Sequence, residues 1–183
     1  MRLPVAADLA AICRLINDPI IAESTGLIRY PYPVMSGRKW IEAAHKPARP
    51  RLHIPYLLTL RSNPHLIVGA AGISLGKGGI PTIGYWIGRP YRRRGYASEA
   101  ARALIDLTFS SSDSSAIGAS ARVTNLASQR VLLGAGMRRV GTGRIKSAQL
   151  GRYLPVLRYR IERKCWEKAR VPRSNAREVH EAL

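Results

Sequence analysis

The sequence predicts a single α+β domain built on a mostly antiparallel sheet. The chain has 183 residues, a length typical of one domain, and its 46% hydrophobic content is enough to form a core. Segments with the apolar spacing of helices are followed by segments with the spacing of strands. We expect one folded domain over residues 1–166 and a charged tail over residues 167–183, frayed or weakly helical from Lys168.

The N-terminal region predicts two helices. Apolar residues recur at helical spacing over residues 5–17, and Asn17-Asp18-Pro19 is expected to end the first helix. Ser36 is expected to cap a second helix, which ends before Pro47. The segment between them, residues 20–34, has no clean period and is interpreted as a loop or lid.

The rest of the chain predicts the strands of the sheet and two further helices. Strand patterns over residues 52–60, 65–75 and 82–88, separated by turn residues, indicate an antiparallel meander. Helical spacing follows over residues 97–109 and 126–135. Further strands are expected over residues 116–123 and, as a pair, within residues 137–161.

The chain is strongly basic, with 30 Lys and Arg against 11 Asp and Glu and a formal net charge of +19. This surplus indicates anionic partners and says nothing about the fold. No apolar run approaches the ~20 residues of a membrane span, and Asp8 and Arg14 interrupt the N-terminal apolar run, so no membrane association and no secretory signal are expected. Cys13 and Cys165 are expected to be free thiols, which favours a cytoplasmic location.

The most informative segment is residues 82–101, where a strand, a basic turn and a helix follow one another. The first N–H groups of a helix lack intrahelical partners and carry partial positive charge, so such a turn suits a phosphate. Gly95 allows close approach of the backbone to the phosphate, and Ala97 keeps a second position small. Side-chain charge can be added by three consecutive residues, Arg92, Arg93 and Arg94. Three consecutive arginines usually form a solvated surface. Here the flanking small residues and the strand-to-helix context favour binding of a phosphate.

The pattern Arg92-x-x-Gly95-x-Ala97 resembles the acetyl-CoA pyrophosphate signature of the GNAT acyltransferase superfamily. The resemblance extends over about residues 5–162. Within the superfamily, the sequence is similar in detail to the RimJ/RimL-type protein N-terminal acetyltransferases. The segments that carry this detail are Asn17-Asp18-Pro19, Pro31-Tyr32-Pro33, Asn125 to Ser128 and Gly134 to Met137. The family's usual first strand is reduced to Met1-Arg2-Leu3-Pro4.

The resemblance implies a GNAT-like fold, in which a mixed, mostly antiparallel central sheet is flanked by helices on both faces. It also implies acetyl-CoA as cosubstrate and CoA as product. The cosubstrate would be bound by residues between 86 and 98 and by Asn125 and Ser128. The main chain of Trp86, Ile87 and Gly88 would pair with the pantetheine arm. The pyrophosphate would be held by Arg92, Arg93, Arg94, Gly95, Tyr96, Ala97 and Ser98. Asn125 and Ser128 would form the family's second cofactor contact.

The catalytic candidates are Ser128, Tyr85 and Glu99. By resemblance, Ser128 faces the thioester sulfur and stabilises the leaving thiolate. The general base is not evident from the sequence. Two candidates for it are a water held by Tyr85 and the carboxylate of Glu99. Each residue also has a structural interpretation: Asn125 is a good helix cap with Ser128 in the first turn, Tyr85 or Trp86 can be a core residue, and Glu99 suits a helix N-terminus.

Two functions from different classes follow from these observations. The first is an acetyl-CoA-dependent N-acetyltransferase that acts on a primary amine, either a protein N-terminus of the ribosomal-protein type or a small amine. The second is a catalytically silent acyl-CoA-binding or nucleic-acid-associated module. Single-strand binders stack bases on aromatic side chains, and the basic C-terminal run has few aromatics, which argues against specific nucleic-acid binding. Contact with the ribosome or another anionic surface would use the charge, and the chain is expected to be a monomer or homodimer. The four histidines show no metal-ligand spacing, so no metal site is expected.

Overall fold

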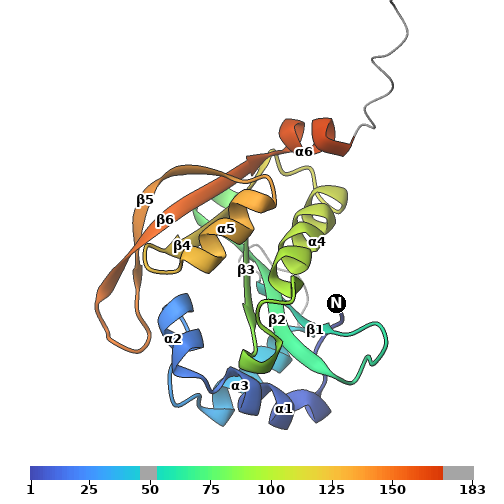
Figure 1. The fold of residues 1–183 in the computed structure, drawn as a ribbon, viewed down its shortest axis with the longest axis vertical. Coiled ribbons are helices and arrows are strands. Elements are labelled where there is room, and N and C mark those ends of the chain that lie inside the picture. The colour runs from blue at the N-terminus through green and yellow to red at the C-terminus, as the bar shows by residue number, and fades with distance from the viewer. Residues whose placement is uncertain (46–52, 171–183) are drawn as a thin grey trace, which may run out of the picture.

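The computed structural model describes residues 1–45 and 53–170, and its centre is a six-stranded sheet (Figure 1). The strands lie in the order β1-β2-β3-β4-β6-β5, and all neighbours are antiparallel except β3 and β4. The mixed, mostly antiparallel sheet is thus confirmed. The strands are β1 (His53–Thr59), β2 (Ile67–Leu75), β3 (Pro81–Ile87), β4 (Ala116–Arg122), β5 (Arg138–Lys146) and β6 (Tyr153–Glu162).

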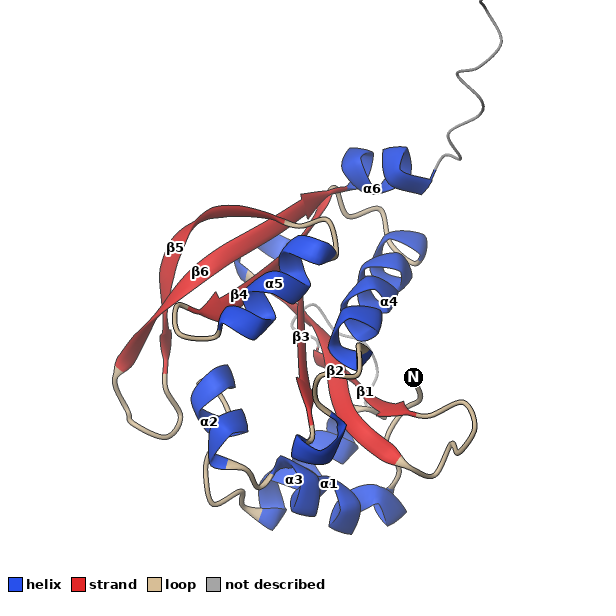
Figure 2. Ribbon diagram, viewed as in Figure 1, coloured by secondary structure: helices blue, strands red, loops and turns tan. Residues whose placement is uncertain are grey.

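Helices cover both faces of this sheet, as Figure 2 shows by colour. On one face, α4 and α5 pack over a large core that contains Leu104, Ile117 and Leu132. On the other face, α1 and α3 pack over a smaller core around Ile12 and Leu57. The helices are α1 (Leu9–Ile16), α2 (Pro19–Thr25), α3 (Val34–Ala43), α4 (Tyr96–Ser110), α5 (Leu126–Gly134) and α6 (Arg163–Arg170).

The expected loop over residues 20–34 is wrong in its first part, because α2 occupies Pro19–Thr25. The Asp18 side chain accepts a hydrogen bond from the Ile20 amide at 2.8 Å, and Pro19 stands at the first helical position. Asn17-Asp18-Pro19 therefore ends α1 and also starts α2, since Asp is a strong N-cap and Pro fits the first turn. Gly26, at φ +67, then ends α2 in the left-handed conformation.

Two other helix ends differ from expectation. α3 begins at Val34 with Pro33 at its N-cap position, so Ser36 lies inside the first turn instead of capping it. At the other end of the chain, α6 continues to Arg170 through part of the expected tail. Trp166 secures α6, because its indole donates to Asp106 at 2.6 Å and its ring packs 5.1 Å from that of Phe109. Residue 52 and the tail beyond residue 170 lie outside the described residues.

The N-terminal residues add only a short bridge to the sheet. The amide of Arg2 donates to the carbonyl of Leu57 at 3.1 Å, and the amide of Leu57 donates to the carbonyl of Arg2 at 2.8 Å. The guanidinium of Arg2 also binds the Asp8 carboxylate at 2.7 Å, which lowers the pKa of that carboxyl. In the described part of the chain, no helix has the length and apolarity to cross a membrane.

The sheet opens at its centre, and this opening positions the site. The parallel pair β3 and β4 shares one register position, Thr82 opposite Gly118. Beyond it the two strands diverge, and β4 continues alongside β6 (Figure 1). The backbone groups of β3 that face the gap are therefore left without a strand partner.

Candidate active site

The gap between β3 and β4 forms a cavity of about 880 Å³. Neighbouring residues of β3 reach it from opposite sides of the sheet, because alternate side chains of a strand point to opposite faces. Tyr85 and Ile87 pack with the core under α4 and α5, whereas Trp86 packs with the core under α1 and α3. All three line the cavity, which thus connects the two faces of the sheet.

The turn before α4 presents a run of free backbone donors to this cavity. The amides of Ser98 and Glu99 both donate to the carbonyl of Gly95 at 3.0 Å. The amides of residues 93–97 have no partner among the residues that the structure describes. Arg93 and Gly95 both adopt the left-handed conformation, at φ 62 and φ 82, and such alternation turns successive N–H groups toward one point. With the positive end of the α4 dipole, the turn forms an anion cradle.

The three arginines of the turn do not act alike. Arg92 is held within the protein, since its guanidinium donates to Asp18 at 2.7 Å and to the Ile87 carbonyl at 3.1 Å. Both Arg92 and Arg93 line the cavity. Arg94 is exposed and is not among the cavity's lining residues. Arg92 thus ties the turn to the start of α2. The contact of all three arginines with one anion stays a prediction.

The main chain of β3 divides between its neighbour β2 and the gap. The amide of Gly88 donates to Val68 at 2.9 Å, which fixes the alternation of the antiparallel ladder. Trp86, two residues earlier and opposite Ala70, has its backbone groups toward β2. Ile87 therefore directs its N–H toward the gap, and its carbonyl accepts from Arg92. Of the three residues expected to pair with a pantetheine arm, Ile87 alone keeps a free donor there.

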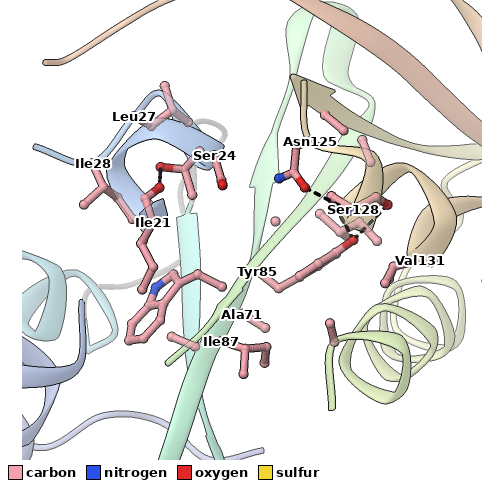
Figure 3. Close-up of a pocket in the computed structure, with 18 of the residues that line it drawn as sticks. Ile21, Ser24, Leu27, Ile28, Ala71, Tyr85, Ile87, Asn125, Ser128 and Val131 are labelled. Carbon is pink, nitrogen blue, oxygen red and sulfur yellow. Dashed lines mark hydrogen bonds between the residues drawn. The ribbon is translucent and has the colours of Figure 1, made fainter. Parts of the chain in front are cut away.

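Two of the catalytic candidates meet across the cavity. The hydroxyls of Tyr85 and Ser128 lie 3.0 Å apart, and Figure 3 shows the phenol extending from β3 to the first turn of α5. Asn125 caps α5, accepting from the Ser128 amide at 3.0 Å, and so fixes the start of the helix. Burial raises the pKa of Tyr85 to about 12, so its hydroxyl stays protonated at neutral pH. The pair can donate hydrogen bonds to an anion in the cavity.

Glu99 stands apart from this arrangement. Its side chain is exposed on α4, and it does not line the cavity. The described residues also contain no cluster of His, Cys, Asp and Glu that could hold a metal ion.

His53 is one of the polar residues at the cavity that the sequence does not predict. His53 lines it from β1, opposite Ser74 in the register, and its Nδ1 lies 2.8 Å from the Ser74 hydroxyl. Its Nε2 accepts from the indole of Trp40 at 3.2 Å, so Nδ1 carries the proton and donates to Ser74. Partial burial lowers the pKa of His53. No local pattern in the sequence indicates this placement, which depends on strand register.

Several solved structures share this fold. The aminoglycoside acetyltransferase AAC(6')-Ib in complex with ribostamycin and coenzyme A matches with a TM-score of 0.71 and 22% identity, covering 96% of this chain and 97% of the other. The spermidine N-acetyltransferase from Vibrio cholerae with CoA and spermine matches with a TM-score of 0.73 and 16% identity, covering 91% and 96%. RimL, the ribosomal L7/L12 α-N-protein acetyltransferase, in complex with coenzyme A, gives 0.69 and 20%, covering 88% and 92%.

These similarities establish the fold alone, because sequence identity is low. No curated relative matches the chain at a significant level. A family model described as "Acetyltransferase (GNAT) domain" matches residues 1–138, which include the anion cradle, Tyr85 and Ser128. On the strength of that match over most of its length, this chain belongs to the GNAT acetyltransferases.

Proposed function

We propose that the protein transfers an acetyl group from acetyl-CoA to a primary amine, either a protein N-terminus or a small amine, as a RimJ/RimL-like enzyme. One observation carries the proposal: a single cavity joins the turn with the free amides of residues 93–97, all but Arg94 of which line it, to the Tyr85–Ser128 hydroxyl pair. Such a cavity offers donors to a diphosphate at one end and donors to a leaving thiolate at the other. The structural neighbours with bound CoA support the same ligand.

The residues present fit the cofactor. The cradle of residues 93–97 would hold the pyrophosphate with backbone donors, and Arg93 would add one charge. A Cβ at Gly95 would meet no atom within 4 Å, which leaves room for a phosphate against the backbone. The free N–H of Ile87, in the gap between the strands, would pair with the pantetheine arm or polarise the acetyl carbonyl.

When bound, acetyl-CoA supplies an activated acetyl thioester, and this chain's residues supply position and proton donors. Tyr85 and Ser128 donate hydrogen bonds where thiolate charge develops, and the high pKa of Tyr85 keeps it a donor. Tyr85 thereby acts with Ser128 as a hydrogen-bond donor to the thiolate, in addition to any water it holds. The proton that the attacking nitrogen loses balances the one that the thiolate gains. Holding the amine against the thioester supplies much of the remaining acceleration.

Mass spectrometry of the reaction tests this proposal. The purified chain is incubated with acetyl-CoA and a panel of peptides and small amines, and products with one added acetyl group are sought. We expect acetylated amine with release of free CoA thiol. Binding of acetyl-CoA without transfer to any amine would instead support the silent acyl-CoA-binding alternative.

The basic surface has a proposed role in the same reaction. Exposed cations gather on β5, β6 and the turn between them; they are Arg138, Arg139, Arg144, Lys146, Arg152 and Arg158. We propose that this hairpin contacts an anionic surface that presents the acceptor, such as a ribosome or an acidic protein. The free thiols of Cys13 and Cys165 support a cytoplasmic setting.

A further inference from the structure

The half of the cavity on the α1–α3 face has an apolar wall. Trp86 and the segment from α2 to α3 form this wall, which we call the acceptor-side wall. Figure 3 shows part of it, with Ile21, Ser24, Leu27 and Ile28 on the opposite side of the view from Ser128 and Val131. Its lining residues are Ile20, Ile21, Ser24, Thr25, Leu27, Ile28, Tyr32, Trp40 and Trp86. A ligand that fills this half therefore meets aliphatic and aromatic side chains.

No carboxylate lines the cavity within the described ranges 1–45 and 53–170. Three acidic residues lie near the wall in sequence, and none of their side chains lines the cavity. Glu42, two residues after Trp40, is exposed on α3. The carboxylate of Asp18 is bound by Arg92 at 2.7 Å. Glu23 has a side chain that is 69% exposed and lines a separate depression of about 170 Å³. An ammonium group in the cavity would therefore have no anionic partner among these residues.

The charge that does line this half is positive. Arg122, at the end of β4, reaches the cavity with only 12% of its side chain exposed. It donates to the backbone carbonyl of Glu23 at 2.9 Å, and it lies 3.9 Å from the Glu23 carboxylate, which is exposed to solvent. Its Nε has no hydrogen-bond partner in the structure. A buried guanidinium raises the cost of bringing a second cation close to it.

These surroundings select among amines by their basicity. The attacking amine must be neutral, and a site with burial, a neighbouring cation and no carboxylate favours the neutral form. An α-amino group has a pKa of about 7.7–8.0 and a lysine-type amine about 10.4, so near pH 7.5 their neutral fractions differ roughly two hundredfold. A polyamine or aminoglycoside would also bring further ammonium groups that nothing in the cavity would neutralise.

We propose that the acceptor is a weakly basic primary amine on an apolar body, carrying no second cationic group, and that polycationic amines are excluded. This inference rests on the proposed acetyl transfer and deepens it. The same chemistry occurs in the N-terminus of a peptide with an apolar first residue and in a free small amine such as an amino-acid amide. The cavity itself keeps the amine neutral, which accounts for the lack of a carboxylate base.

Competition among four acceptors tests the inference. The full chain and acetyl-CoA are assayed at one pH with a short peptide beginning with leucine, with leucinamide, with spermidine and with kanamycin. We expect kcat/KM for the better leucine acceptor to exceed that for either polycation by about a hundredfold or more, and the ratio of peptide to leucinamide distinguishes the two sources. A polycation acetylated as well as the leucine acceptors would overturn the inference while leaving acetyl transfer intact. Transfer to no acceptor, with acetyl-CoA bound, would overturn the proposed function and the inference with it.

A carboxylate placed in the wall gives a second test. Ser24→Asp adds an anion on α2 where Ser24 lines the cavity. It should raise the ratio of spermidine to leucine-peptide kcat/KM by roughly tenfold, the equivalent of one pKa unit of charge interaction. Ser115→Asp adds the same charge at an exposed site outside the cavity and should leave the ratio unchanged. Equal ratios in the two folded variants would contradict the inferred role of the missing carboxylate.

Discussion

Replacing Gly95 with alanine separates the backbone cost of the turn from its capacity to bind an anion. Gly95 has φ +82, and a Cβ at this position would meet no atom within 4 Å. The folded protein therefore has space for the methyl group and bears only the cost of a left-handed alanine, ~1–2 kcal/mol. For a domain of this size we expect Tm to fall by about 2–8 °C, with the fold retained.

The effect on CoA binding should be larger. The added methyl group enters the space before the free amides of residues 93–97, where the pyrophosphate would lie. Loss of two hydrogen bonds to a charged group costs ~3–6 kcal/mol, which corresponds to at least about a hundredfold increase in Kd. Calorimetric titration of the variant with CoA measures this change.

Gly151→Ala is the matched control. Gly151 also has a left-handed conformation, at φ +66, and also has open space at its Cβ, but it lies in the turn between β5 and β6. We expect the same loss of Tm and an unchanged Kd. Wild-type CoA affinity in a folded Gly95→Ala variant would refute the assignment of the cradle.

Further substitutions test the hydroxyl pair and the tie between α2 and the turn. Ser128→Ala and Tyr85→Phe should each lower kcat about tenfold or more, with CoA affinity little changed. Steady-state kinetics with detection of the free thiol measures this. A kcat equal to that of the wild type in both variants would contradict the role of the two hydroxyls as donors to the thiolate. Because burial raises the pKa of Tyr85 to about 12, the protonated donor persists as pH rises, so the wild-type kcat profile should show no alkaline decline until pH approaches that value. Asp18→Asn retains a cap for α2 but loses the ion pair with Arg92, and should lower stability by ~1 kcal/mol and weaken CoA binding severalfold. Glu23→Gln, at an exposed carboxylate 3.9 Å from Arg122, is its control and should change neither the melting curve nor the titration.

The sequence predicts those parts of the fold whose structure depends on residues adjacent in the chain. The strand, turn and helix around Gly95 depend on adjacent residues, and α4 was found at Tyr96–Ser110 against an expectation of residues 97–109. The sequence does not predict α2, because its seven residues are too few to show an apolar period and its Asp18-Pro19 start also marks the end of α1. A short polar sequence can perform both roles.

Contacts between distant residues account for most of what the sequence did not reveal. Tyr85 and Ser128 were both candidates, but their 3.0 Å contact joins residues 43 positions apart and depends on the divergence of β3 and β4. Arg92 fits the signature and lines the cavity, and its ion pair with Asp18, 74 positions away, is a contact that no local motif indicates. His53 reaches the cavity through strand register, which no local motif encodes.

The most direct test is a crystal structure of the protein with bound CoA. The pyrophosphate should lie within hydrogen-bond distance of the backbone amides of residues 93–97, and the sulfur should lie beside the hydroxyls of Tyr85 and Ser128 in the gap between β3 and β4. A pyrophosphate bound away from the α4 turn, or a sulfur on the far side of the sheet from the hydroxyl pair, would contradict the proposed site.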